Sequence, residues 1–132
     1  MTKAQQSQTD RAARVLIADD HPQGVELLDA YLADTGFEIE TAYDGDEALR
    51  KVRDWRPDLV LLDIMMPKIS GFEVCEKVKA DPELRSIKII LLTAKGQDSD
   101  REVGRLAGAD DYMTKPFSPT KILERAREIL EQ

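Results

Sequence analysis

The chain of 132 residues contains only one cysteine, one histidine and few aromatic residues. The lone Cys75 excludes an internal disulfide and is consistent with a reducing compartment. One histidine and one cysteine are too few for a His/Cys zinc cluster. No stretch approaches the roughly 20 apolar residues of a membrane span, and the N-terminus lacks a hydrophobic signal-peptide core. We therefore expect a cytoplasmic protein with no membrane partner.

Basic residues are outnumbered, with 19 lysines and arginines against 26 acidic residues and a net charge of −7. A nucleic-acid-binding domain would carry a basic face, so we expect no direct contact with nucleic acid. The length and the 42% share of hydrophobic residues fit one globular domain. Residues 1–13 are polar and without periodicity, which predicts a disordered tail or linker before one domain over residues 14–132.

The most informative hydrophobic stretch is the run LVLL at residues 59–62, which ends in Asp63 and is followed by Pro67. A run this apolar predicts a strand that is buried on both faces. Asp63 is not a packing residue, because burying an unpaired charge costs several kcal/mol, roughly, or forces the carboxyl neutral. Asp63 therefore needs a cation, a shell of hydrogen-bond donors or solvent.

Four further strand patterns alternate with helix patterns along the chain. The strands are expected at residues 15–18, 37–43, 87–92 and 111–114, and the helices at about 22–36, 44–56, 71–81, 97–107 and 118–130. The fourth helix has a thin apolar stripe (Val103, Leu106 and Ala107) that Gly104 interrupts, so we expect it to be the least stable. The alternation predicts a doubly wound α/β domain with five parallel strands covered by helices on both faces.

Polar side chains stand at the carboxyl ends of these strands, where doubly wound sheets form their functional crevice. Asp19 and Asp20 follow the first strand, Asp63 ends the third, Thr93 follows the fourth and Lys115 follows the fifth. Three converging carboxylates require a cation, and Mg²⁺ prefers oxygen ligands. Asp63 could then attack phosphorus as a nucleophile. The Lys115 ammonium and the Thr93 hydroxyl could hold the charged phosphoryl oxygens.

This combination of motifs resembles the response-regulator receiver domain of two-component signalling, in the CheY-like superfamily. The resemblance is carried by Asp19-Asp20, by the segment DIMMP at residues 63–67 with Gly71, by Thr93-Ala94 and by Lys115-Pro116, and it spans about residues 14–130. It implies a flavodoxin-like sheet with strand order 2-1-3-4-5, a property of the family and not a deduction from the strand patterns.

The resemblance also implies individual roles. Asp63 would be the phosphoacceptor, and Mg²⁺, or Mn²⁺ in its place, would be bound by Asp19, Asp20, Asp63 and the main-chain carbonyl of Met65. Thr93 and Lys115 would hold phosphoryl oxygens.

Two further features are implied near the end of the chain. The peptide bond between Lys115 and Pro116 would be cis. Tyr112 would act with Thr93 as a switch, its ring moving inward when Thr93 is drawn to the phosphate.

The implied partners are a sensor histidine kinase or a histidine phosphotransfer protein as phosphodonor. Downstream, a protein target or a second copy of the chain would read the surface of the fourth helix, fifth strand and fifth helix, from about Gln97 onward. Phosphorylation would shift the population between two arrangements of that surface. Such a protein is a signalling phosphoacceptor, with self-catalysed phosphoryl transfer and slow autodephosphorylation as its only reactions.

Several alternatives remain open. The chain could be a single-domain regulator or a receiver excised from a longer regulator with an output domain. A phosphatase of the haloacid dehalogenase type is disfavoured because Met65 stands where that family needs a second acid. A pseudo-receiver is disfavoured because every reactive position is filled. His21 is interpreted as a loop residue, not a ligand or base, and Cys75 as a core thiol.

Overall fold

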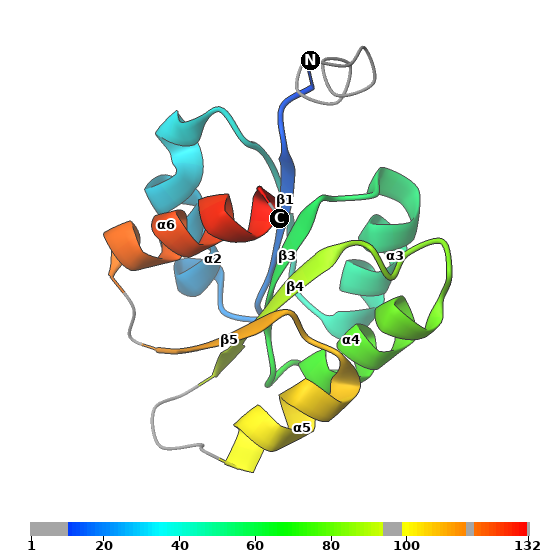
Figure 1. Ribbon diagram of the computed structural model, residues 1–132. Coiled ribbons are helices and arrows are strands. Elements are labelled where there is room, and N and C mark those ends of the chain that lie inside the picture. Colours follow the sequence, from blue (N-terminus) through cyan, green and yellow to red (C-terminus); the bar gives the residue numbers. More distant parts are fainter. Residues whose placement is uncertain (1–10, 94–98, 116–117, 132) are drawn as a thin grey trace.

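The computed structural model describes residues 11–93, 99–115 and 118–131 of the chain. The strands within them are β1 (Arg14–Ala18), β2 (Glu38–Ala42), β3 (Leu59–Asp63), β4 (Lys88–Thr93) and β5 (Asp111–Thr114). The helices are α2 (Pro22–Leu32), α3 (Gly45–Trp55), α4 (Gly71–Ala80), α5 (Ser99–Ala107) and α6 (Pro119–Leu130), with a short 3-10 helix, η1, at Ala33–Thr35. Helices and strands alternate throughout (Figure 1).

The five strands form one parallel sheet, as the strand patterns predicted, in the order β2-β1-β3-β4-β5 that the family resemblance implied. The strand β2 lies at one edge, and its exposed Glu38 and Glu40 agree with the alternating pattern of that segment. The register pairs Asp63 with Leu92 and Thr93 with Thr114. Because the strands are parallel, all their carboxyl ends meet at one edge of the sheet.

Helices cover both faces of the sheet (Figure 1). Alternate strand residues, such as Leu16 and Ile17, belong to two different hydrophobic clusters. One cluster is closed by α3, α4 and α5, and the other by α2 and α6. All five residues of β3 are buried, which confirms that the run ending in Asp63 is an inner strand.

Side-chain caps begin three of the helices at the carboxyl edge of the sheet. Asp44, Ser70 and Ser118 each accept a hydrogen bond from the main-chain N–H three residues later, at the starts of α3, α4 and α6. These bonds satisfy N–H groups that a helix leaves without internal partners. Pro119 stands in the first turn of α6, as predicted.

The helix α5 packs through a different face from the one that we expected. Gly104 and Ala107 are buried, but Val103 is 45% exposed and Leu106 is 72% exposed. A Cβ atom at Gly104 would lie 2.8 Å from Cδ1 of Leu91, so the glycine lets the helix approach the sheet closely. Gly104 therefore does not interrupt the helix, and the predicted apolar stripe is wrong in two of its three members.

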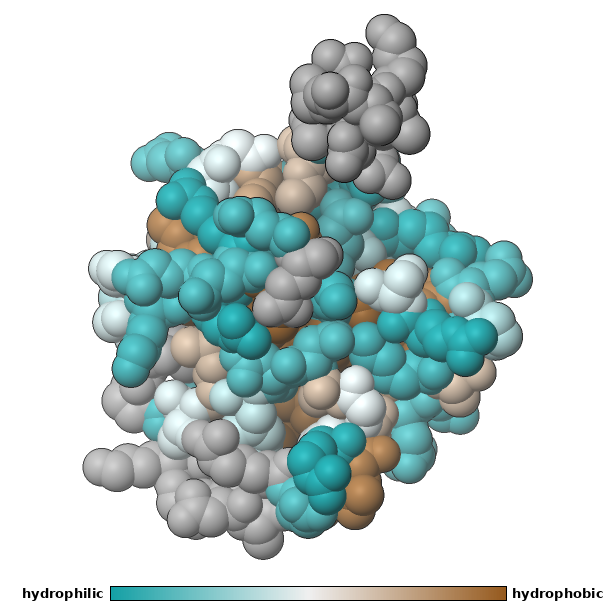
Figure 2. All heavy atoms as spheres, in the orientation of Figure 1, coloured by the Kyte–Doolittle hydropathy of each residue, from teal (hydrophilic) through white to brown (hydrophobic). Residues whose placement is uncertain are grey.

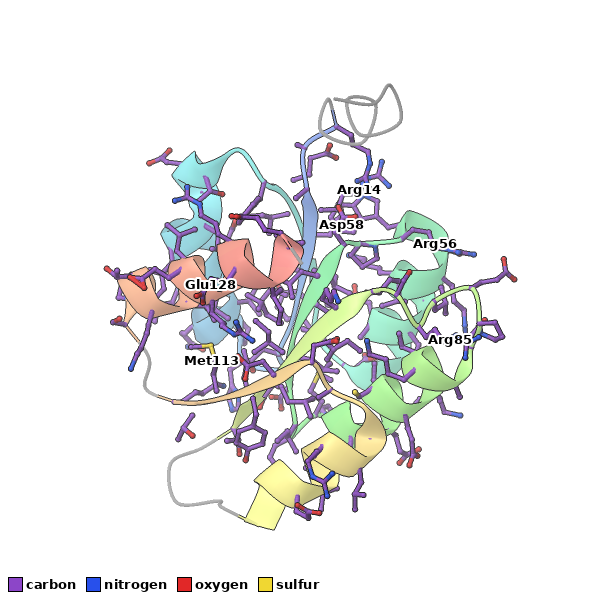
Figure 3. The ribbon with its side chains drawn as sticks, in the orientation of Figure 1. Arg14, Arg56, Asp58, Arg85, Met113 and Glu128 are labelled. Atoms are coloured by element: carbon purple, nitrogen blue, oxygen red, sulfur yellow. The ribbon has the colours of Figure 1, made fainter. Side chains whose placement is uncertain are left out.

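The face of the molecule in Figure 2 is predominantly hydrophilic, with scattered hydrophobic patches. No helix in the described ranges is long and apolar enough to cross a membrane. At the amino ends of the strands, the Asp58 carboxylate accepts hydrogen bonds from the Arg11 guanidinium at 2.9 Å and from the main-chain N–H of Arg14 at 2.8 Å. Figure 3 labels Arg14 and Asp58 at this end, away from the carboxyl edge.

Candidate functional site

The polar residues predicted at the carboxyl edge converge in the structure. Asp19 directly follows β1, Asp63 ends β3 and Thr93 ends β4, and all three side chains are buried. Lys115 directly follows β5 and reaches back over the same edge with its side chain half-buried. Four neighbouring strands thus contribute to one acidic pocket, defined here as Asp19, Asp20, His21, Asp63 and Lys115 with the adjacent Thr93.

The Lys115 ammonium lies between two of the buried carboxylates. Its Nζ atom is 3.2 Å from Oδ2 of Asp19 and 3.7 Å from Oδ2 of Asp63. The main-chain N–H of Lys115 donates to the carbonyl of Thr93 at 2.7 Å, which fixes the residue where β5 ends. Residues 96 positions apart in the chain, Asp19 and Lys115, are therefore brought into direct contact by the sheet topology.

The two buried carboxyls of the pocket differ in their acidity. Burial raises the pKa of Asp63 to about 6, because the surrounding protein disfavours the charged form, and the nearby Asp19 adds to the effect against the opposing Lys115. Burial also disfavours ionised Asp19, but the His21 main-chain N–H and the Lys115 ammonium outweigh it and lower the pKa of that carboxyl. Asp19 is thus the more firmly ionised of the pair.

The loop after β3 is held from two sides. The main-chain N–H of Met65 donates to Oδ1 of Asp63 at 3.4 Å, while the Met65 side chain is exposed. A Cβ atom at Gly71, the first residue of α4, would lie 2.4 Å from the main-chain oxygen of Asp63. A Cβ atom at Gly45, the first residue of α3, would lie 2.1 Å from the main-chain oxygen of Ile69. Both helices therefore begin with glycine because the loop passes so close.

His21 belongs to the pocket more closely than the sequence indicated. It is the N-cap residue of α2, as a loop residue before Pro22 should be. However, its Nδ1 atom lies 3.1 Å from Oδ1 of Asp19 and 3.0 Å from Oδ1 of Asp20. The only sequence signal for this contact was its position beside the acid pair, and that position does not determine where a ring points.

The pocket has the donor set of a divalent cation site. Asp19, Asp20, His21 and Asp63 each offer one ligand atom, and these atoms all lie within 4.8 Å of one another. The Oδ1 atom of Asp20 is buried and accepts no hydrogen bond from the described residues. A buried carboxylate oxygen that accepts no well-aligned hydrogen bond is unfavourable unless positive charge is near. Carboxylate oxygens are the ligands that Mg²⁺ prefers, so these residues fit such an ion.

The remaining predicted residues lie near the pocket or outside the described ranges. Tyr112 is half-buried on β5 and packs against the cluster under α3, α4 and α5, beside Gly104. Pro116, and with it the predicted cis peptide after Lys115, lies outside the described residues. Cys75 is a core thiol as expected, and burial raises its pKa to about 12.

A second polar depression lies near the amino ends of the strands, lined in part by Arg11 and Arg56. Both arginines are already paired there, Arg11 with Asp58 and Arg56 with Glu83. Figure 3 labels Arg56 and Asp58 in this region. The depression therefore lacks the concentration of buried charge found at the carboxyl edge.

Comparison with known proteins agrees with the acidic pocket and the strand order. The sequence model of the response regulator receiver domain matches residues 15–127. The chain belongs to the response regulator receiver domain family. A solved structure of the chemotaxis response regulator CheY4 of Vibrio cholerae is 32% identical to this receiver, with a TM-score of 0.84, and the match covers 90% of this chain and 99% of that one.

Curated relatives of this receiver include longer regulators. The alkaline phosphatase synthesis transcriptional regulatory protein PhoP of Bacillus subtilis is 42% identical over 90% of this chain and 49% of its own length. The DNA-binding response regulator MtrA of Mycolicibacterium smegmatis is 42% identical over 90% of this chain and 51% of its own length. The receiver thus spans about half the length of these relatives.

Proposed function

We propose that this receiver accepts a phosphoryl group on Asp63 from the phosphohistidine of a sensor histidine kinase or a histidine phosphotransfer protein. The observation that supports this most strongly is the Lys115 ammonium, 3.2 Å from Asp19 and 3.7 Å from Asp63 at the end of a buried strand. The Lys115 ammonium favours the ionised form of Asp63 and lies beside the position that a phosphoryl group would occupy. The receiver unit would begin at about residue 14.

The transfer needs the ionised form of Asp63. One oxygen of the carboxylate forms a bond to phosphorus, and the bond between phosphorus and the donor imidazole nitrogen breaks. The electron pair of that bond returns to the imidazole, which takes up a proton from solvent. The pKa of Asp63, raised by burial to about 6, leaves most of the carboxyl ionised at neutral pH.

Asp19, Asp20, Asp63 and the main-chain carbonyl of Met65 would hold Mg²⁺, or Mn²⁺ in its place. The bound ion would neutralise charge that develops on the phosphoryl oxygens. Asp19, whose pKa is lowered, supplies a permanent negative charge for such an ion. The contacts of Gly45 and Gly71 with the loop after β3 would keep the Met65 carbonyl in place.

Lys115 and Thr93 would bind the phosphoryl oxygens of the product, an acyl phosphate. Phosphorylation adds about two negative charges and three acceptor oxygens. The Lys115 ammonium would exchange part of its contact with Asp19 for these oxygens, and the Thr93 hydroxyl would turn toward them. Tyr112, two residues before the end of β5, would move inward with Thr93.

The surface of α5, β5 and α6 would carry the signal to a protein target or to a second copy of the chain. The exposed Val103 and Leu106 on α5 support this role, because exposed apolar side chains are what a protein partner would bury. The net charge of −7 argues against nucleic acid as the direct ligand of this domain.

Intact-mass measurement after incubation with acetyl phosphate and Mg²⁺ tests the proposal. The wild type should gain one phosphoryl group, Asp63→Asn should gain none, and Asp58→Asn, at the opposite end of the sheet, should behave as the wild type. Release of inorganic phosphate from many phosphoesters would instead favour a phosphatase. A folded protein that gains nothing would favour a pseudo-receiver.

Amide shifts after addition of beryllofluoride, a phosphoryl mimic, test the proposed output surface. Shifts should extend from the pocket through residues 99–115 and into α6. Shifts confined to the pocket would contradict the switch while leaving phosphorylation of Asp63 intact.

A further inference from the structure

The imidazole of His21 faces the acid pair at the spacing of neighbouring metal ligands. Two ligands that lie side by side in an octahedron with bonds of about 2.1 Å are about 3 Å apart. The Nδ1 atom of His21 is 3.1 Å from Oδ1 of Asp19 and 3.0 Å from Oδ1 of Asp20. The three atoms are thus arranged as three ligands of one cation would be.

The two carboxylate oxygens of Asp19 face different groups, and only Oδ1 faces His21 and the proposed cation position. Oδ2 of Asp19 faces the Lys115 ammonium, whereas Oδ1 faces His21 and also accepts its main-chain N–H at 2.9 Å. The buried Oδ1 of Asp20 accepts no hydrogen bond of good geometry from the described residues and lies 3.0 Å from the same ring nitrogen. Three atoms bearing lone pairs converge here. Nδ1 of His21 is within hydrogen-bond distance of Oδ1 of Asp19, so a proton on that ring nitrogen can hold them together in the metal-free protein, and a metal ion would take the place of that proton.

We infer that His21 is a nitrogen ligand that makes the acidic pocket selective for a first-row transition-metal cation, such as Mn²⁺, Co²⁺ or Ni²⁺, over Mg²⁺. Mg²⁺ is a hard ion that takes oxygen ligands, whereas imidazole suits the later first-row ions. An all-oxygen pocket would show less of this preference. The inference rests on the proposed function, because it takes the pocket to be a divalent-cation site.

The sequence makes this ligand easy to detect. His21 is the only histidine in the chain, and Cys75 is buried away from the pocket in the cluster under α3, α4 and α5. An imidazole nitrogen bound to the metal in a chain without an affinity tag can therefore come only from His21. Pulsed electron paramagnetic resonance of the Mn²⁺-loaded protein reports such a directly bound nitrogen.

The experiment compares the wild type with His21→Gln, which keeps a polar side chain but removes the imidazole. Mn²⁺-loaded wild type at about pH 8, where a free imidazole is neutral, should show nitrogen coupling that His21→Gln lacks. In calorimetric titrations, the ratio of Ni²⁺ to Mg²⁺ affinity should fall at least about tenfold in His21→Gln. Glu26→Gln, an exposed change one turn along α2, should alter neither result.

The outcomes separate this inference from the proposed function. Mn²⁺ and Mg²⁺ binding without imidazole coupling, and with an unchanged affinity ratio in His21→Gln, would overturn the role of His21 but leave the Mg²⁺ site standing. Failure of the folded wild type to bind either ion would overturn both. Melting curves in EDTA show whether His21→Gln is folded, and Co²⁺ absorption spectra of the wild type give a second reading of the nitrogen ligand.

Discussion

At the scale of single residues, the acidic pocket holds two neighbouring carboxyls whose pKa values are shifted in opposite directions. Asp63 is buried, and this raises its pKa to about 6, so that it ionises just below neutral pH. Asp19 is buried as well, but the His21 main-chain N–H and the Lys115 ammonium keep its pKa low. Asp19 is thus firmly ionised, whereas burial disfavours the charge of Asp63, the proposed nucleophile, even with Lys115 nearby.

Replacing Asp63 with asparagine should stabilise the metal-free protein. The folded-state pKa of Asp63 exceeds the unfolded value near 4, so the folded protein binds the extra proton between about pH 4 and 6 and loses stability as pH rises through that window. At pH 7.5 in EDTA, Asp63→Asn should therefore raise the free energy of unfolding by up to roughly 3 kcal/mol, the equivalent of about two pKa units. Urea unfolding followed by circular dichroism measures the difference.

The pH series supplies the control for this substitution. Below about pH 4, where Asp63 is protonated in both states, the advantage of Asp63→Asn should disappear. Asp58→Asn should instead destabilise the protein at neutral pH, because the Asp58 carboxylate accepts bonds from Arg11 and Arg14. If Asp63→Asn were less stable than the wild type at pH 7.5, the ionised Asp63 would be stabilised by its surroundings in spite of its burial, and this account of its pKa would be wrong.

At the scale of elements, the loop between β3 and α4 depends on close backbone contacts. Gly45 donates its N–H to the Pro67 carbonyl at 3.4 Å, and its Cα hydrogen faces the Ile69 carbonyl. Lys68, in the same loop, has a left-handed φ of 72°. Its Nζ atom lies 3.4 Å from the carboxylate of Asp44, the N-cap residue of α3. The start of α3 therefore controls the loop that carries Met65.

Gly45→Ala should both destabilise the protein and weaken Mg²⁺ binding. The new Cβ atom would lie 2.1 Å from the Ile69 oxygen, so the loop backbone must move, and overpacking of this kind costs about 1–3 kcal/mol. Calorimetry should show lower Mg²⁺ affinity, because the Met65 carbonyl moves with the loop. Gly36→Ala is the matched control. Gly36 has a φ of 87°, which strains any other residue, but no atom lies close to the new Cβ. The substitution should therefore lower stability without changing Mg²⁺ affinity.

An exposed position on α5 and a buried position on β4 beneath that helix should respond differently to substitution. Leu106→Ser should change the free energy of unfolding by less than about 0.5 kcal/mol, because Leu106 is 72% exposed. Leu91→Ala, beneath Gly104 in the core, should cost about 2–5 kcal/mol. Chemical denaturation of both variants tests the assignment. A comparable loss of stability in the two variants would mean that Leu106 is buried, as the sequence pattern predicted.

The sequence predicted an element correctly where its local pattern determines its position, and incorrectly where close packing does. The strand β5 was predicted at residues 111–114 and is found there, because a polar start and a lysine-proline stop bound a short β-prone segment. The packed face of α5 was mispredicted because periodicity counts apolar side chains. Gly104, which has none, is the residue that contacts Leu91.

At the scale of the whole molecule, the topology brings the pocket together. Parallel strands with right-handed crossovers place all their carboxyl ends at one edge. The convergence of Asp19, Asp63 and Lys115 was therefore predictable from apolar runs that end in polar residues. The direction of the His21 ring was not, because a side-chain rotamer beside a helix start leaves no trace in hydrophobic periodicity.

Mg²⁺ should stabilise the folded protein as a whole. A ligand that binds only the folded state adds about 2.7 kcal/mol at a concentration of 100 times its dissociation constant. Adding Mg²⁺ at constant ionic strength should therefore raise the melting temperature of the wild type, whereas Asp20→Asn should respond weakly. An equal rise in Asp20→Asn would indicate general screening of the net charge of −7 in place of a specific site.

The central claim is that Asp63 alone receives the phosphoryl group, and chemical mapping tests it most directly. Borohydride reduces an acyl phosphate to an alcohol, which converts a phosphorylated aspartate into homoserine. After treatment with acetyl phosphate, Mg²⁺ and borohydride, peptide sequencing by mass spectrometry should find homoserine at position 63. Homoserine at position 19 or 20, or a phosphoryl group retained on His21, would contradict this account.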